Sequence, residues 1–255
     1  MGGPQLAAAA AIAALCFGCA QPAAASVPGH VAWSCDFEGT YCGMQEQSKV
    51  EPEHRSTFVA QARSGNQAIR LTTLPGDDHV HSSGDWERDD LELPPSPDYC
   101  NEGQDEWWSV SILFPDDYVV PRGLGAILDF HTNASTGAPN LNLMSRPDGL
   151  ELTGYYGDIK NPREYKARLG RVRRNKWYDF VFHVKWSSHE DGLATAWVDG
   201  ERVLAHRGPT LYPGMSCYLK LANYHDAAGR PSSIVFDRLM RGTSAEVVAL
   251  TDLWH

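Results

Sequence analysis

Two short segments of the sequence place side chains that could move protons along one side of a strand. Residues 126–131 and 217–224 alternate apolar and polar side chains, the period-two pattern of a strand with one buried and one exposed face. The exposed rows contain Asp129 and His131 in the first segment, and Tyr218, Lys220, Ala222 and Tyr224 in the second. Histidine, tyrosine and lysine side chains together could remove a weakly acidic proton and protonate a leaving oxygen near neutral pH.

The rest of the chain reads as short strands separated by turn signals such as Pro75-Gly76-Asp77-Asp78 and Pro147-Asp148-Gly149. No segment after residue 25 shows a sustained apolar period of 3.6 residues, so helices are not expected. The segments with strand character are 67–72, 107–114, 125–131, 140–144, 150–155, 177–186, 193–198, 217–224 and 234–238. We predict an all-β fold, a sandwich of two antiparallel sheets.

The first 25 residues predict a secretory signal peptide. Residues 6–19 are small and apolar, and Ala23-Ala24-Ala25 offers a small-residue cleavage site. The run is shorter than the roughly 20 residues that span a bilayer, and no later segment is long enough, so we expect no membrane span. We therefore expect a secreted protein with one domain over residues 26–255. A periplasmic location, or a lipid anchor on Cys19, is the alternative.

Four cysteines remain after the signal peptide, and an even number in an exported protein indicates two disulfides. Cys35 and Cys42 are the preferred pair, because the seven-residue separation with Gly39 between them can form a tight turn. That choice leaves Cys100 to pair with Cys217. Four buried free thiols are the alternative, and metal binding is disfavoured because no CxxC spacing occurs.

The clearest hairpin is residues 193–204, where Asp199-Gly200 suits a two-residue type I′ turn. With residues 176–187, this hairpin resembles the sheet core of the concanavalin-like jelly rolls. Four more segments resemble the jelly-roll polysaccharide lyases of the heparin lyase I and glucuronan lyase type, and the resemblance covers most of residues 33–245. Those segments are 87–93, 107–111, 129–131 and 218–224.

The resemblance implies a jelly roll whose concave sheet binds an acidic polysaccharide and cleaves it by β-elimination, with no required cofactor. The catalytic residues that it implies are Arg88, His131, Lys220 and Tyr224. The sequence departs from the family pattern at Asp90, where glutamate is more usual, and at His225-Asp226, where a basic residue is commoner. These departures bear on the choice among glucuronan, alginate and heparin-like substrates.

The chemistry of such a cleavage can be argued from the residues themselves. Elimination across the 4-linkage of a uronic acid removes the C5 proton, which only the neighbouring carboxylate acidifies. Donors aimed at the developing charge can contribute roughly 3–4 kcal/mol each in a site that excludes water. Arg88 suits this role as a permanently charged planar donor, and Asn140 and Asn142 point outward on a neighbouring segment.

The same reaction needs a base near C5 and an acid near the O4 oxygen, and His131 and Tyr224 are the best-placed side-chain types. Tyrosine has a reference pKa near 10, so it needs a nearby cation to act as a base. Lys220, four residues earlier on the same strand face, is expected to lower the pKa of Tyr224.

The formal net charge is −10, yet residues 160–176 carry eight basic residues around one acid. Such a run can steer an acidic chain into a groove, and within it Arg163 and Lys166 are expected to bind substrate. Tyr156, beside Tyr155, is expected to stack on a sugar ring. The alternative is a solvated basic loop. Nucleic acid is disfavoured as a partner because no recognition motif occurs.

Two other functions fit parts of the sequence. Glu87, Asp89 and Glu92 have the spacing of the catalytic carboxylates in jelly-roll glycoside hydrolases, where two carboxylates act about 5–5.5 Å apart. Glu92 would share a face with the other two only if the strand contained a β-bulge. A non-catalytic carbohydrate-binding module is the second alternative.

A structural calcium ion is a further expectation. Glu38 near the first strand and Asp237 near the last could meet, because the first and last strands of such sandwiches are often neighbours. Carboxylate oxygens are ligands that calcium prefers. We also expect the protein to be a monomer.

Overall fold

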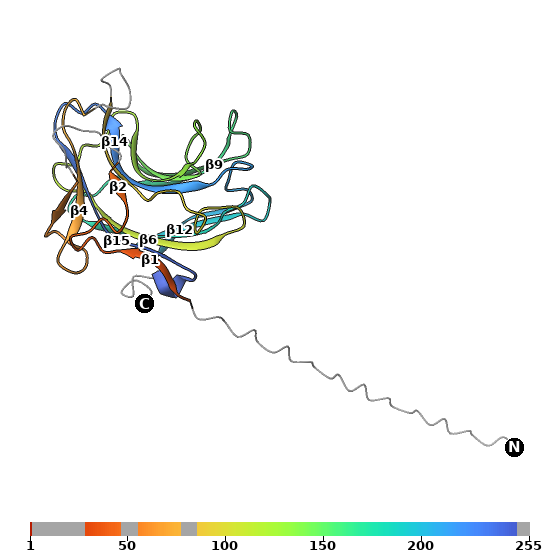
Figure 1. The fold of residues 1–255 in the computed structure, drawn as a ribbon. Coiled ribbons are helices and arrows are strands. Elements are labelled where there is room, and N and C mark those ends of the chain that lie inside the picture. Colours follow the sequence, from red (N-terminus) through yellow and green to blue (C-terminus); the bar gives the residue numbers. More distant parts are fainter. Residues whose placement is uncertain (2–28, 47–55, 78–85, 249–255) are drawn as a thin grey trace.

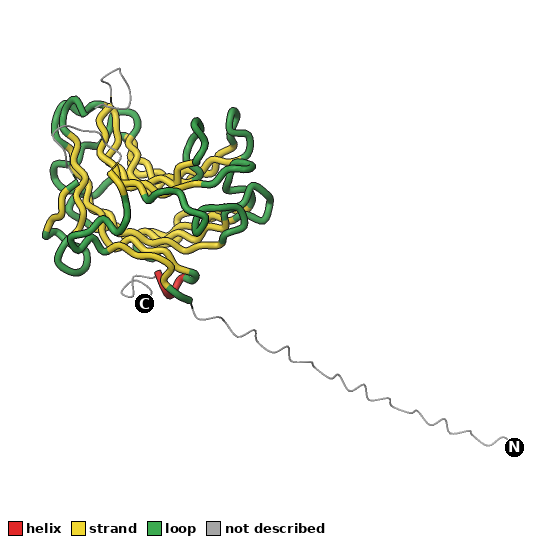
Figure 2. The backbone as a smooth tube through the Cα atoms, viewed as in Figure 1, coloured by secondary structure: helices red, strands yellow, loops and turns green. Residues whose placement is uncertain are grey.

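A computed structural model of the protein describes residues 29–46, 56–77 and 86–248, together with Met1. Two antiparallel sheets stack as a sandwich, which confirms the predicted all-β jelly roll (Figures 1 and 2). Within these ranges the helical structure is α1, Ala245–Val248, which packs below the sandwich beside β1 (Val31–Cys35). The predicted signal peptide, after Met1, lies outside the described residues. No helix of the described part is long and apolar enough to cross a membrane.

The eight-stranded sheet has the order β13-β12-β11-β6-β15-β4-β3, and β1 pairs with β15. Its strands, besides β1, are β3 (Thr57–Val59), β4 (Ala68–Thr73), β6 (Asp105–Leu113), β11 (Trp177–Lys185), β12 (Leu193–Val198), β13 (Glu201–Arg207) and β15 (Ser232–Gly242). The seven-stranded sheet has the order β10-β9-β8-β7-β14-β5-β2. Its strands are β2 (Gln45–Glu46), β5 (Trp86–Glu92), β7 (Gly125–Thr132), β8 (Leu141–Arg146), β9 (Gly149–Tyr156), β10 (Arg163–Gly170) and β14 (Cys217–Asp226).

Every segment with strand character in the sequence overlaps a strand, and the hairpin turn at Asp199-Gly200 has positive φ at both residues, as a type I′ turn requires. The basic residues 160–176 do not form a solvated loop throughout, because residues 163–170 form strand β10. Tyr165, Ala167 and Leu169 alternate with charged residues there, which is the pattern of an edge strand with one apolar face.

Aromatic side chains fill much of the space between the two sheets. The ring centroid of Phe130 on β7 lies 5.3 Å from the ring centroid of Trp108 on β6 and 5.1 Å from that of Trp186, the residue after β11. The two sheets therefore pack on each other through these rings. Phe180 and Phe182 are also fully buried. Rings at these separations add about 0.5–1.5 kcal/mol per pair beyond the burial of their area.

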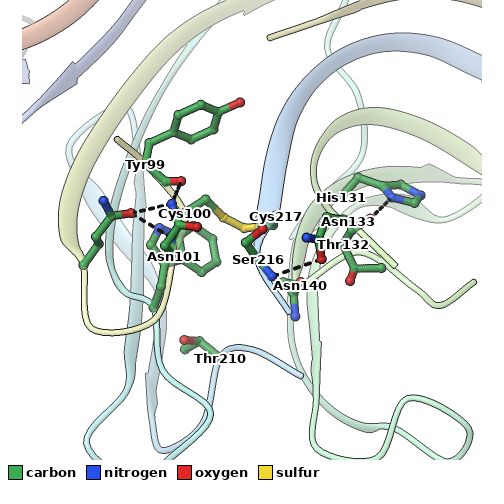
Figure 3. The surroundings of a disulfide bond; sticks show 12 residues. Tyr99, Cys100, Asn101, His131, Thr132, Asn133, Asn140, Thr210, Ser216 and Cys217 are labelled. Carbon is green, nitrogen blue, oxygen red and sulfur yellow. Dashed lines mark hydrogen bonds between the residues drawn. A yellow bond between two sulfur atoms is a disulfide. The ribbon is translucent and has the colours of Figure 1, made fainter. Parts of the chain in front are cut away.

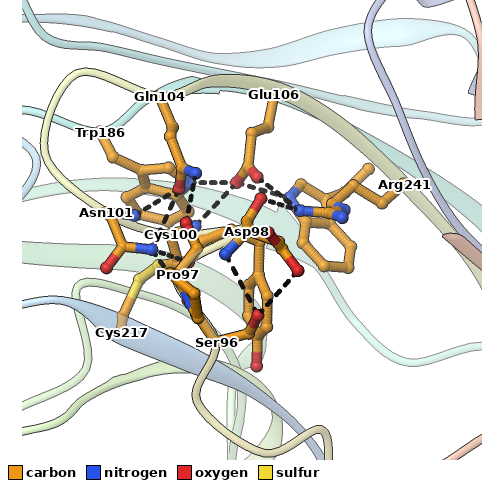
Figure 4. Close-up of polar contacts among 12 residues, drawn as sticks. Ser96, Pro97, Asp98, Cys100, Asn101, Gln104, Glu106, Trp186, Cys217 and Arg241 are labelled. Carbon is orange, nitrogen blue, oxygen red and sulfur yellow. Dashed lines mark hydrogen bonds and ion pairs between the residues drawn. A yellow bond between two sulfur atoms is a disulfide. The ribbon is translucent and has the colours of Figure 1, made fainter. Parts of the chain in front are cut away.

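A buried carboxylate, Glu106 on β6, joins the eight-stranded sheet to the loop before it (Figure 4). Its oxygens accept hydrogen bonds from the indoles of Trp186 at 2.7 Å and Trp108 at 3.3 Å. They also accept from the Cys100 backbone N–H at 3.2 Å and from the Arg241 guanidinium at 3.1 Å. Four donors therefore replace the water that this carboxylate lost on folding.

Both predicted disulfides are confirmed. Cys35–Cys42 closes the turn after β1, with Cα atoms 5.6 Å apart. Cys100–Cys217 ties the start of β14 to the loop between β5 and β6, with Cα atoms 5.2 Å apart (Figure 3). Cys217 is also paired with Thr132 at the end of β7, so this disulfide holds together the strand ends beside His131.

Candidate active site

The outer face of the seven-stranded sheet is concave and open to solvent (Figure 1). A cavity of about 260 Å³ lies on this face. It is lined by side chains of β7, β8, β9 and β14 and of the neighbouring loops, namely Leu124, Ala126, Asp129, His131, Ala138, Pro139, Asn142, Met144, Arg146, Thr153, Tyr155 and Tyr224. His131 and Tyr224, which are far apart in the sequence, therefore line one cavity.

Strand register explains why these residues share a face. Directly paired residues of neighbouring strands point to the same side of a sheet. Tyr224 pairs with Arg88 of β5, and Lys220 pairs with both Glu92 of β5 and Asp129 of β7. The register shifts between Leu221 and Tyr224, where β14 has one more residue than β7. Such a bulge re-aims side chains.

His131 is held in one tautomer by its neighbour. Its Nδ1 lies 2.9 Å from the backbone oxygen of Thr132 (Figure 3). A carbonyl oxygen can only accept a hydrogen bond, so Nδ1 carries the proton of the neutral ring. The lone pair of the neutral imidazole is therefore on Nε2 and is available to take a proton.

The cation beside Tyr224 is Arg88. The guanidinium carbon of Arg88 lies 5.4 Å from the centroid of the Tyr224 ring, and the Trp86 ring packs 5.3 Å from the same ring. Arg88 donates to Asp90 through Nε at 2.8 Å and through Nη2. Burial opposes the charge of Arg88, but Asp90 outweighs it and raises the pKa of the guanidinium.

Lys220 is not placed to lower the pKa of Tyr224, which corrects the expectation from the sequence. Four residues of strand separate their Cα atoms by about 13 Å. The Lys220 Nζ instead lies 5.2 Å from the centroid of the Tyr218 ring and 3.8 Å from a carboxylate oxygen of Glu92. Burial raises the pKa of Tyr218 to about 12, so this phenol stays protonated at neutral pH.

Asp129 is a buried carboxylate on the floor of the cavity. Its Oδ1 has no hydrogen-bond partner among the described residues, and neither has Oδ1 of Asn142, its register partner on β8. Burial raises the pKa of Asp129 above its ordinary range, against the opposing effect of His131 and Lys220. Burial likewise raises the pKa of Glu92, and Lys220 opposes this shift. The floor therefore contains polar atoms whose hydrogen bonds are incomplete.

Two of the five residues expected to bind substrate lie on the concave face. Asn142 lines the cavity. Lys166 of β10 pairs with Thr153, which also lines the cavity, and its Nζ contacts Glu164 at 2.6 Å.

The other three do not face the cavity. Asn140 is fully buried, and its Nδ2 donates to the Tyr155 backbone oxygen at 3.1 Å. Tyr156 points between the sheets, where its ring lies 5.5 Å from that of His206 on the other sheet. Arg163 pairs with Tyr156 and so shares its side of the sheet. Of the adjacent pair Tyr155 and Tyr156, it is Tyr155 that faces the cavity.

Arg146 of β8 also lines the cavity and was missed from the sequence. Its Nε lies 3.4 Å from a carboxylate oxygen of Glu151. The signal was available, because Asn142, Met144 and Arg146 alternate along one strand and must share a face.

The carboxylates expected for a glycoside hydrolase are divided between the two faces of β5. Glu87 and Asp89 are buried between the sheets, where Asp89 accepts from Thr72 N at 2.7 Å and Ser56 Oγ at 3.2 Å. Glu92 lies on the concave face with Lys220. The register between β5 and β14 is regular, so the bulge that would bring the three carboxylates together is absent there.

Glu38 and Asp237, the expected calcium ligands, approach the same loop. Glu38 Oε1 accepts from the backbone N–H groups of Asn66 and Gln67, at 2.5 and 3.0 Å. Asp237 Oδ2 accepts from those of Arg63 and Ser64, at 2.7 and 2.9 Å. Among the described residues, no three His, Cys, Asp or Glu side chains gather as a metal site. Backbone donors thus already solvate both carboxylates.

Several solved structures with this architecture are lyases. The endo-β-1,4-glucuronan lyase from the fungus Trichoderma reesei aligns with a TM-score of 0.70 at 14% identity, covering 86% of this chain and 98% of that one. The marine PL-14 alginate lyase from Aplysia kurodai aligns with a TM-score of 0.55 at 13% identity, covering 83% and 98%. The cellulose induced protein Cip1 aligns with a TM-score of 0.54 at 12% identity, covering 83% and 97%. These likenesses define the class of fold, the jelly roll of the polysaccharide lyases.

Residues 37–240 match the family model described as polysaccharide lyase. The chain therefore belongs to the polysaccharide lyase family and is a polysaccharide lyase. No curated protein sequence matches it.

Proposed function

We propose that this lyase cleaves a 4-linked polysaccharide containing uronic acid, such as glucuronan, alginate or a heparin-like chain, by β-elimination at the concave face. The observation that carries the proposal is that His131 and Tyr224 line the same cavity. The glucuronan and alginate lyases of similar fold support the substrate class.

The first requirement is to neutralise the uronate carboxylate, because this makes the C5 proton removable. Arg88 is the proposed donor: Asp90 engages Nε and Nη2, and the Nη1 donors have no partner among the described residues. Asn142 lines the cavity and supplies a neutral side-chain amide. Donors that are already positioned for the developing charge do not have to reorganise during the reaction.

The proton transfers are assigned from the chemistry of the two groups. His131 Nε2 takes the C5 proton, the electron pair of the C5–H bond forms the C4–C5 double bond, and the C4–O4 bond breaks. Tyr224 donates its phenol proton to the leaving O4. A phenol with a reference pKa near 10 is protonated at neutral pH and can donate without prior activation.

Arg88 links the two requirements. After donation, Tyr224 is a phenolate, and a guanidinium 5.4 Å from the ring centroid stabilises that anion. Arg88 thus favours both the substrate carboxylate and the phenolate product of the proton transfer. The role that the sequence suggested for Lys220 is assigned here to Arg88, and Lys220 is proposed to offset the charges of Glu92 and Asp129 on the concave face.

The test is a panel of glucuronan, alginates and heparin-like chains, assayed for the ultraviolet absorbance of the new double bond. An uncharged β-1,4-glucan is the matched control. We expect absorbance with at least one uronate polymer and none with the glucan. Reducing ends released without absorbance would indicate hydrolysis and contradict the proposal, and so would binding without any cleavage.

Secretion is part of the proposal. The two disulfides support it, because disulfides persist in oxidising compartments. A tagged chain expressed in its host should appear in the medium with Ser26 as its first residue. Retention in the cell with an intact N-terminus would contradict this.

A structural calcium near Glu38 and Asp237 stays a prediction; both carboxylates approach the loop of residues 63–67, where an ion would compete with the backbone N–H groups that they accept from. Oxygen ligands of this kind suit calcium. Chelator should lower the melting temperature, and an unchanged melting curve would contradict the prediction. The elimination proposed above uses protein side chains for each proton transfer.

A further inference from the structure

A second cavity, separate from the concave face, lies where the edge strands of the two sheets meet. It measures about 430 Å³, within the roughly 300–1,000 Å³ of small-ligand sites. The end of β10, the loop that follows it and the β12–β13 turn surround it. Its walls combine an apolar part, Leu150, Leu169, Tyr178, Val198 and Val203, with a charged part, Arg171, Arg173, Lys176, Asp199 and Glu201.

The cations of this cavity differ from those of the concave face. Across the described residues, each of four concave-face cations lies near a carboxylate: Arg88 with Asp90, Lys220 with Glu92, Arg146 with Glu151, and Lys166 with Glu164. In the second cavity Lys176 binds Asp199 at 2.5 Å. The guanidinium groups of Arg171 and Arg173 have no ion-pair partner in the described part of the chain, and Glu201 is the remaining acid.

The loop that carries these arginines is fixed in place. The Arg173 backbone N–H donates to the Tyr178 hydroxyl at 2.8 Å, and the Arg174 guanidinium donates to the Tyr118 backbone oxygen at 2.7 Å. Asn175 donates from its backbone to Phe114 O at 2.8 Å and from its side chain to Asp116 at 2.6 Å. A positioned loop loses little conformational freedom when it binds a ligand, which favours affinity.

We propose that this cavity is a second binding site for the acidic polysaccharide, in which Arg171 and Arg173 bind a uronate carboxylate and the apolar wall contacts the C–H faces of a sugar. The nature of the ligand rests on the proposed function. Three strand spacings, about 15 Å, separate β7, which carries His131, from β10. The pairing also places His131 opposite Glu164 of β10, six residues or about 20 Å along the strand from Gly170 at the second cavity. One long chain can therefore occupy both sites, and a short one cannot.

Binding at the second site would hold a polymer near the concave face and raise the effective concentration of the polymer there. The protein needs such a local site because its net charge of −10 repels a polyanion at long range. The basic run of the sequence is thus divided by the fold. Lys166 and Arg168 lie on the concave side of β10, and Arg171, Arg173 and Lys176 lie at the second cavity.

The test is retardation of the protein in native gels that contain soluble polyglucuronate. Arg171→Ala and Arg173→Ala should each weaken binding about threefold, because an exposed ion pair contributes a factor of up to about five. Glu201→Gln removes the remaining acid and should tighten binding by a similar factor. Arg207→Ala is the matched control, since it removes an exposed arginine six residues, about 20 Å, along β13 from Glu201.

The second readout is kinetic. Arg171→Ala and Arg173→Ala should raise KM for long polyuronate and leave kcat unchanged, and they should not alter cleavage of the shortest oligosaccharide that the enzyme cleaves. Unchanged retardation in both variants, or an equal loss in Arg207→Ala, would overturn the inference. If retardation changes as expected but no uronate polymer yields ultraviolet absorbance, the second site stands and the proposed elimination fails.

Discussion

Two buried carboxylates, one in each sheet, have similar burial and opposite surroundings. Glu106 in the eight-stranded sheet is 6% exposed and receives hydrogen bonds from four donors (Figure 4). Asp129 in the seven-stranded sheet is 7% exposed, its Oδ1 has no partner among the described residues, and burial raises its pKa. The same contrast extends to the arginines nearby, since Arg241 lies over the buried Trp108 ring and Arg88 over the Tyr224 ring of the cavity.

The difference separates charge that stabilises the fold from charge that is available for chemistry. A carboxylate whose hydrogen bonds are complete offers nothing to a ligand, and removing it leaves buried donors unpaired. A carboxylate with incomplete hydrogen bonds costs stability but can respond to a substrate. Substitutions around Glu106 should lower stability without changing the rate. Substitutions of the cavity residues should change the rate, except at Asp129, where the expected effect is a gain in stability.

The largest expected effect is on the rate at Tyr224. Tyr224→Phe removes only the hydroxyl and should lower kcat by about 10²–10⁴-fold, the usual contribution of a general acid or base. The melting temperature should be unchanged. Initial rates of absorbance increase and a thermal melt measure both quantities, and full activity in the variant would remove Tyr224 from the mechanism.

Next in size is the stability effect at Glu106. Glu106→Gln should lower the free energy of unfolding by about 3 kcal/mol, because breaking a buried ion pair costs roughly 3–5 kcal/mol and glutamine keeps one acceptor. Urea denaturation measures this. Below the unfolding transition kcat should match that of the wild type, and a selective loss of kcat would break the contrast between the two clusters.

The two arginines sharpen the same comparison. Arg88→Lys should reduce kcat/KM about tenfold, because a point charge cannot reproduce the planar donor fork. Arg241→Lys is the matched control and should lower stability with little effect on kcat/KM. Equal kinetic losses in both variants would indicate that arginine geometry matters only through the fold.

The smallest effect is expected at Asp129, and its sign depends on pH. Because the pKa of Asp129 is raised in the folded state, its ionisation destabilises the fold progressively as pH rises from the unfolded-state pKa through the folded-state value. Asp129→Asn should therefore raise the free energy of unfolding, measured by urea denaturation, at pH 8. Near pH 4 the gain should vanish. A gain that grows toward acid pH would contradict the direction of the shift.

Much of the fold and part of the site could be predicted because strand periodicity is local. The alternation in residues 126–131 and 217–224 placed Asp129, His131 and Tyr224 on one face, and the spacing of the cysteines gave the disulfides. The choice between Tyr155 and Tyr156 required the phase of β9, which the pairing with β8 and β10 sets. The cation beside Tyr224 could not be predicted. Arg88 lies on the neighbouring strand β5, and strand periodicity does not show which residues of two strands are paired.

The edges of the seven-stranded sheet have a consequence for behaviour at high concentration. One edge, β2, is two residues long, and the other, β10, alternates exposed charged residues with its apolar ones. An exposed sheet edge is a template for pairing with another chain, and short or charged edge strands disfavour that pairing. We expect the same charges to act as gatekeepers against aggregation, so that replacing Lys166 and Arg168 with threonine would promote edge-to-edge assembly and scatter light in concentrated solution.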